Sequence, residues 1–134
     1  MLNKAEIKKE YYTHKEIDDL IAIKIMGWHK YRDPIWDGAS VWEDEEGDWH
    51  GTVEDFKPSE NMNDAWEVAK KLKMSVAPQI SNNTVHWCAS IEGYSSSAVT
   101  NKLAEVSICL SALEYVDISA KIEESDISKL FRGV

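Results

Sequence analysis

The sequence has few of the residues on which the commoner site chemistries depend. Its two cysteines, Cys88 and Cys109, form no Cys-x-x-Cys pair, its four histidines stand apart, and its six glycines are spread singly. Zinc sites, redox dithiols and glycine-rich phosphate loops therefore have no support. The serine run at 95–97 lacks the flanking pattern of a nucleophile elbow. We expect a protein that is not an enzyme and that carries no cofactor and no metal.

The sequence also lacks a basic excess and a long apolar run. It has 15 Lys and Arg against 24 Asp and Glu, a net charge of −9. Because cations hold a phosphate backbone, direct nucleic-acid binding is not expected. Without a signal peptide or a membrane-length apolar run, and with unpaired cysteines, the sequence predicts a cytoplasmic protein with no membrane partner. Its 134 residues suit a single domain over 1–134.

Apolar residues recur with helical spacing in three segments. The predicted helices span 14–27, 62–73 and 102–116. Thr13 and Glu16 form a capping-box pattern ahead of the first helix. Trp28 and Trp66 fall on apolar helical faces, which predicts that both are core residues. Cys109 lies in the apolar stripe of the third helix and is expected to be a small buried residue.

Between these helices the apolar period changes to 2, which indicates strands. The predicted strands are 41–43 with 49–53, 74–80 with 85–91, and 94–99 as a candidate fifth strand. The first hairpin would place Trp42 opposite Trp49. Pro78 cannot donate to a strand ladder and predicts an edge strand. The class is therefore α+β, with an antiparallel sheet of four to five strands and about three main helices.

Several motifs occur together in one order and spacing. They are MGW at 26–28, WEDEEG at 42–47, DFKPS at 55–59, AWEV at 65–68 and ICLSAL at 108–113. Over about residues 14–116 the sequence resembles the phage ABA sandwich domain of small phage and prophage proteins in Gram-positive bacteria. The resemblance implies a three-layer α-β-α sandwich and a phage or prophage origin, and it brings no catalytic residues. Residues 1–13 and 117–134 would be terminal extensions of this domain.

The segment 34–60 stands out for its charge and its indole rings. It carries nine acidic residues against one cation, Lys57, and three of the six tryptophans. Carboxylates and indole faces both attract cations, which predicts a surface for a ligand or partner. The candidate binding residues are Trp36, Trp42, Trp49, Asp37, Glu43, Asp44, Glu45, Glu46 and Asp48. The same pattern also suits a solvated hairpin tip beside packed indoles.

Three function classes agree with these observations. The first is a non-enzymatic phage accessory protein in the host cytoplasm, which binds a host protein or a small aromatic or nucleotide ligand in countering host defence. The second is an acidic nucleic-acid mimic that inhibits a DNA- or RNA-binding host protein. The third is a small virion structural or assembly component, for which Ile127, Leu130 and Phe131 on the C-terminal tail would join a homo-oligomer. The sequence identifies no particular ligand or partner.

Overall fold

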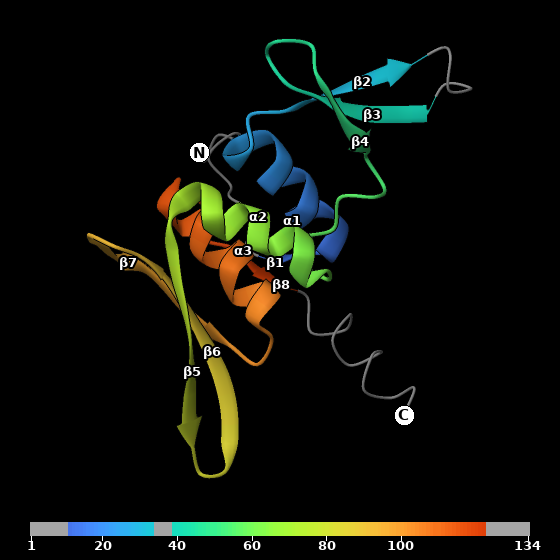
Figure 1. Cartoon of the computed structure of the whole chain (residues 1–134). Coiled ribbons are helices and arrows are strands. Elements are labelled where there is room, and N and C mark those ends of the chain that lie inside the picture. Colours follow the sequence, from blue (N-terminus) through green and yellow to red (C-terminus); the bar gives the residue numbers. More distant parts are fainter. Residues whose placement is uncertain (1–10, 34–38, 123–134) are drawn as a thin grey trace, which may run out of the picture.

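Helices form the centre of the structure, a computed structural model that describes residues 11–33 and 39–122. The helical elements are α1 (His14–Leu20), its π-helical continuation η2 (Ile21–Ile25), α2 (Met62–Leu72) and α3 (Ala104–Tyr115). They pack side by side, with the sheets at their margins (Figure 1). All three predicted helices are confirmed. The first ends two residues earlier than expected and finishes in the wider π-helical turn, where Met26 N donates to Ile21 O at 3.0 Å.

The capping-box pattern at the start of α1 is confirmed. Thr13 Oγ1 accepts from the backbone N–H of Glu16 at 3.2 Å, and Glu16 Oε1 accepts from the backbone N–H of Thr13 at 3.1 Å. Helix α2 begins in the same way, with the Asn61 side chain accepting from the N–H groups of Asn63 and Asp64. These bonds satisfy donors that a helix start otherwise leaves unpaired. The local sequence therefore determines where both helices begin.

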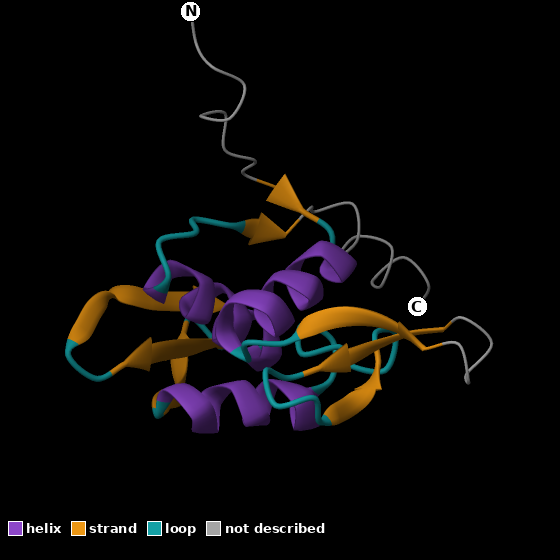
Figure 2. Ribbon diagram, turned by 90° about the horizontal axis from the view of Figure 1, so that it is seen from above, coloured by secondary structure: helices purple, strands orange, loops and turns teal. Residues whose placement is uncertain are grey.

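The described strands form two antiparallel sheets and one short parallel pair (Figure 2). One sheet has the order β2 (His29–Asp33), β3 (Ala39–Glu43) and β4 (Trp49–Thr52). The other has the order β5 (Met74–Ser81), β6 (Thr84–Ile91) and β7 (Tyr94–Asn101). The parallel pair is β1 (Tyr11–Tyr12) with β8 (Lys121–Ile122). The α+β class is confirmed, whereas the prediction of one sheet with four to five strands is wrong because the strands divide between sheets.

The β5–β6 hairpin agrees closely with its sequence pattern. Its pairing runs unbroken from Met74 opposite Ile91 to Ser81 opposite Thr84. Asn82 and Asn83 close it with φ of 50° and 65°, the left-handed conformation that a two-residue hairpin turn requires. The edge position predicted for the strand of Pro78 is confirmed, and the candidate fifth strand is confirmed as β7.

Helix α3 is the most deeply enclosed element. Its residues from Val106 to Leu113 are all buried, and Ser107 Oγ donates to the backbone carbonyl of Trp87 at 2.6 Å. Cys109 is fully buried, as predicted, and burial raises the pKa of its thiol well above the ordinary value. A thiol held neutral in this way is chemically inert.

The two tryptophans that were predicted on helical faces differ in their surroundings. Trp28 is half-buried and packs against the core, as predicted. Trp66 is 49% exposed, so its assignment to the core is wrong. Its neighbours on α2, Ala65 and Val68, fill the contact with the rest of the protein and leave the indole on the outer margin of that face.

Candidate functional site

The acidic candidate residues gather at the connection between β3 and β4. Asp44 and Glu43 are partly buried, while Glu45, Glu46 and Asp48 are exposed at the tip. Trp49 follows the tip and is 57% exposed. Trp36 and Asp37 lie outside the described residues. The structure therefore brings together six of the nine candidates on one hairpin, which we call the acidic hairpin (Glu43–Trp49).

Trp42 is a correction to the predicted site. Its indole is fully buried, lies 6.4 Å from the ring of Trp28 between centroids, and belongs to the hydrophobic core. Glu43, rather than Trp42, lies opposite Trp49, and the register then shifts by one residue before the pair of Val41 with Thr52, with the extra residue in β4. A bulge inserts an extra residue and changes which side chains face each other. Trp42 and Trp49 therefore do not form a cross-strand pair, and Trp42 is not accessible to a ligand.

Asp44 organises the loop of the acidic hairpin. Its Oδ1 accepts from the backbone N–H groups of Glu46 and Asp48, both at 2.9 Å, and its Oδ2 lies 2.8 Å from Nε2 of His50. The hydrogen bond with His50, followed by that from the Asp48 backbone, lowers the pKa of Asp44. The His50 ring in turn stacks on Trp28 at 4.5 Å between centroids. A connected series of contacts thus joins the loop to the core.

The carboxylates of Asp44, Glu46 and Asp48 offer oxygens within 4.8 Å of one another. Oxygen clusters of this kind suit a hard cation such as Ca²⁺. Both oxygens of Asp44, however, already take part in hydrogen bonds that shape the loop. The turn itself accounts for the cluster, and we assign no metal to it.

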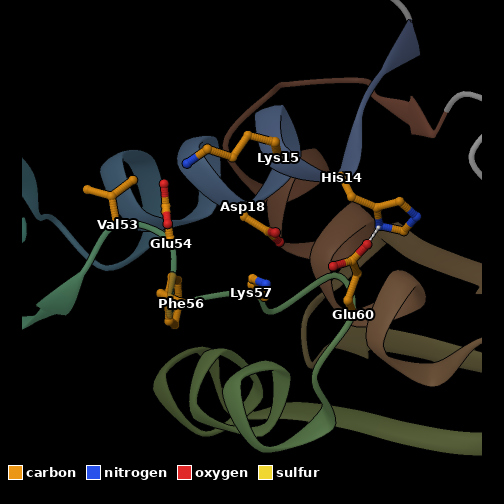
Figure 3. A pocket seen from close by; sticks show the side chains of 8 residues that line it. All are labelled: His14, Lys15, Asp18, Val53, Glu54, Phe56, Lys57 and Glu60. Carbon is orange, nitrogen blue, oxygen red and sulfur yellow. Dashed lines mark ion pairs between the residues drawn. The ribbon is translucent and has the colours of Figure 1, made fainter. Parts of the chain in front are cut away.

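A second polar group, which the sequence analysis did not predict, lies at the start of α1 (Figure 3). His14 Nδ1 lies 2.9 Å from Ser59 Oγ, and Asp18 Oδ1 accepts from the backbone N–H of Ser59 at 2.8 Å. All three residues are buried, and Glu60 Oε1 lies 4.0 Å from His14 Nδ1. Beside them is a hollow of about 360 Å³. Serine, histidine and aspartate in contact invite comparison with a hydrolytic triad.

The connectivity of this cluster differs from that of a triad. In a triad the histidine contacts the serine through one ring nitrogen and the carboxylate through the other. Here Asp18 bonds Ser59 rather than the imidazole, and Nε2 of His14 is buried without a partner among the described residues. Ser59 is also only 1% exposed. The cluster therefore holds the 55–59 segment against α1 and has no arrangement for activating a nucleophile.

Folding changes the pKa of Asp18. Burial raises its pKa from 3.8 to about 6, even though the hydrogen bonds from Ser59 act in the opposite direction. A buried carboxyl group loses the water that stabilises its charge, which favours the protonated form. The cluster is therefore sensitive to pH in the mildly acidic range.

The model of the phage ABA sandwich domain matches residues 19–113 of the sequence. The chain belongs to this family. A crystal structure of a phage protein from Bacillus cereus ATCC 14579 has a TM-score of 0.57 at 22% identity, covering 86% of this chain and 97% of that one. This likeness shows a shared fold. None of the curated proteins compared with the chain matches it.

Membership of the family establishes a phage-type protein with a sandwich arrangement of helices and sheets. The helix and loop motifs that suggested the resemblance lie within or next to the matched range. Within residues 11–33 and 39–122, no helix combines the length and the apolar character needed to span a membrane.

The contrast between Trp42 and Trp49 gives a first prediction. We expect Trp42→Ala to lower the free energy of unfolding by about 3–5 kcal/mol, because it empties a packed core site. Trp49→Ala should change it by less than about 1 kcal/mol, because this side chain is largely exposed. Urea unfolding followed by circular dichroism measures both. Equal losses in the two variants would contradict the assignment of Trp42 to the core.

Asp18 gives a prediction about pH. Its pKa in the folded state is above the ordinary value, so its contribution to the free energy of unfolding should fall as the pH rises from about 4 to about 6. The difference is at most about 3 kcal/mol for a shift of this size. In Asp18→Asn this fall should disappear, while the exposed-site control Asp55→Asn should keep it. Urea unfolding at four pH values tests this, and identical pH profiles for wild type and Asp18→Asn would refute it.

Proposed function

We propose that this phage protein is a non-enzymatic accessory protein that acts by binding, and that the acidic hairpin holds a positively charged host protein in countering host defence. The observation that supports this proposal is that some carboxylates of the acidic hairpin lie next to a histidine and others have no ion pair within the described residues. Glu43 lies 3.8 Å from His29, and Asp44 lies 2.8 Å from His50. Among the described residues, no ion pair reaches the carboxylates at the tip, those of Glu45, Glu46 and Asp48.

An unpaired cluster of like charge at a hairpin tip favours a cationic partner. Three exposed carboxylates set up a field that attracts Lys and Arg and speeds the encounter of two proteins. The tip is also well defined in shape, because Asp44 fixes two of its backbone N–H groups. A surface ordered before binding loses less conformational freedom on association. Trp49, exposed beside the tip, supplies an indole that suits an arginine of the partner.

The same charges make a nucleotide ligand a less suitable occupant. The hollow beside the acidic hairpin measures about 520 Å³ and is lined by Asp44, Glu45 and Glu46 together with Trp28, His50 and Lys71. The three carboxylates would repel phosphate groups, and among the described residues the lining has only one lysine to offset them. Lys30, a further cation nearby, is bound to Asp19 at 3.0 Å and lies over the buried ring of Trp42.

The arrangement also favours a localised basic patch on the partner over the long basic cleft that a nucleic-acid mimic would fill. Mimicry needs carboxylates set out in a row, as phosphates are along a strand. Asp44, Glu46 and Asp48 instead form a compact group within 4.8 Å. A compact group suits a localised basic patch on the partner.

Reversal of charge at the tip tests the proposal. We expect the triple variant Glu45→Lys, Glu46→Lys and Asp48→Lys to weaken capture of the host partner at least about tenfold, because it replaces attraction by repulsion. Capture should also weaken as the salt concentration rises. The measurement is quantitative pull-down from host lysate at low and high salt, followed by titration against the purified captured protein.

The matched control changes three exposed acidic residues elsewhere, Glu54, Asp55 and Glu67, to Lys, and so changes the net charge by the same amount. This control should capture the same partner as the wild type. Equal capture by the hairpin variant, or equal loss in both variants, would refute a specific role for the acidic hairpin.

A further inference from the structure

The β5–β6 hairpin has one apolar face along its whole length. The cross-strand pairs on this face are Met74 with Ile91, Val76 with Ala89, Pro78 with Trp87 and Ile80 with Val85. The pairs between them, on the other face, are Ser75 with Ser90, Ala77 with Cys88, Gln79 with His86 and Ser81 with Thr84. Successive residues of a strand point to opposite faces. Because the apolar face continues over four cross-strand pairs, we expect other protein surface to cover it along its full length.

The protein itself covers only half of this face. Ala89 and Ile91 are buried, and Met74 and Val76 pack against the core. Towards the turn, Ile80 is 75% exposed and Val85 is 44% exposed. In Figure 1 the end of the β5–β6 hairpin extends past the helices. The apolar pattern therefore continues beyond the part of the protein that could bury it.

An apolar hollow adjoins the exposed half. It has a volume of about 440 Å³ and lies between the start of α2, the hairpin and the start of α3. Its lining is mostly apolar, with Met62, Trp66, Val76 and Trp87, and one residue of each charge, Lys102 and Glu105, completes it near the start of α3. Both Met62 and Trp66 are exposed. One protein thus presents a projecting apolar pair, Ile80 with Val85, next to an apolar hollow. We call these two features the arm and the hollow.

We propose that the occupant is a second copy of this chain, with the arm of each copy seated in the hollow of the other. A twofold interface requires one surface to carry both complementary parts, and this surface does so. Exchange of two arms covers Ile80, Val85, Met62 and Trp66 in both copies at once. This interface is separate from the acidic hairpin and does not depend on its partner.

The absence of charged residues from the β5–β6 hairpin favours a second copy of this chain as the occupant over a charged partner. From Met74 to Ile91 the sequence has no Asp, Glu, Lys or Arg, in a chain of which 29% is charged. Each copy has a net charge of −9, so two copies repel unless they meet at an uncharged surface. The arm is such a surface, and the acidic hairpin lies on the far side of the helices from it (Figure 1). A charged partner would find no complementary group on the arm.

The interface uses the face of β5 rather than its edge. Strand β5 is an edge strand, and edge strands commonly pair with another chain through their backbone groups. Pro78 lies in the middle of β5 and offers no N–H for such pairing. Side-chain packing of the apolar face therefore remains as the mode of association.

Sedimentation analysis of the full chain tests the proposal. We expect a dimer for the wild type and a rise of at least about 30-fold in the dissociation constant for Ile80→Glu, because the change puts a charge in the centre of an apolar contact. The matched control is Gln79→Glu, which adds the same charge to the adjacent, exposed residue of the opposite face. It should dimerise like the wild type. Circular dichroism and thermal melting confirm that each variant is folded.

A mixing experiment tests the reciprocal arrangement. Ile80→Glu damages the arm and keeps the hollow, whereas Trp66→Lys damages the hollow and keeps the arm. Each variant alone should be monomeric, and an equimolar mixture should form heterodimers because one intact arm still meets one intact hollow. A monomeric wild type, a dimeric Ile80→Glu variant, or a mixture without heterodimers would overturn the proposal.

Discussion

The complete enclosure of α3 is the constraint on which the rest of the structure depends. A helix buried from Val106 to Leu113 has no solvent-facing side, so other elements must cover it all round. Helix α2, the turn η2 and the β5–β6–β7 sheet supply this cover. The bond from Ser107 to the Trp87 carbonyl then fixes the helix against the sheet. The acidic hairpin, by contrast, lies outside this assembly, and its tip residues Glu45, Glu46 and Asp48 are exposed.

The sequence predicted the elements whose determinants are local. The capping box at Thr13 and Glu16, the edge position of Pro78 and the burial of Cys109 were all correct, because each depends on neighbouring residues and on apolar period. Strand β2 was missed, because its sequence HKYRD has charged residues in place of an apolar alternation. Trp66 was misassigned because an apolar helical face can extend past the part that the protein covers.

The site was harder to predict because its geometry depends on contacts between distant residues. The register that places Glu43 opposite Trp49 was not predicted, so the sequence pattern assigned both Trp42 and Trp49 to one surface. The contact between Asp18 and Ser59 spans 41 positions, and the DFKPS motif indicated a landmark without showing its partner. The clustering of acids was read correctly from charge counts, since those residues are neighbours in sequence. Only the structure shows that Glu43 and Asp44 lie next to histidines whereas, among the residues it describes, the carboxylates at the tip do not.

The part played by Asp44 bears on how this protein can change over generations. The side chain of Asp44 keeps the loop in shape by accepting hydrogen bonds from the backbone N–H groups of Glu46 and Asp48. These bonds do not depend on the side chains of Glu46 and Asp48. Glu45 and Glu46 can therefore be exchanged for other residues while the loop stays in place. In the binding role proposed above, such a loop would let the specificity of the tip change while the scaffold keeps its shape.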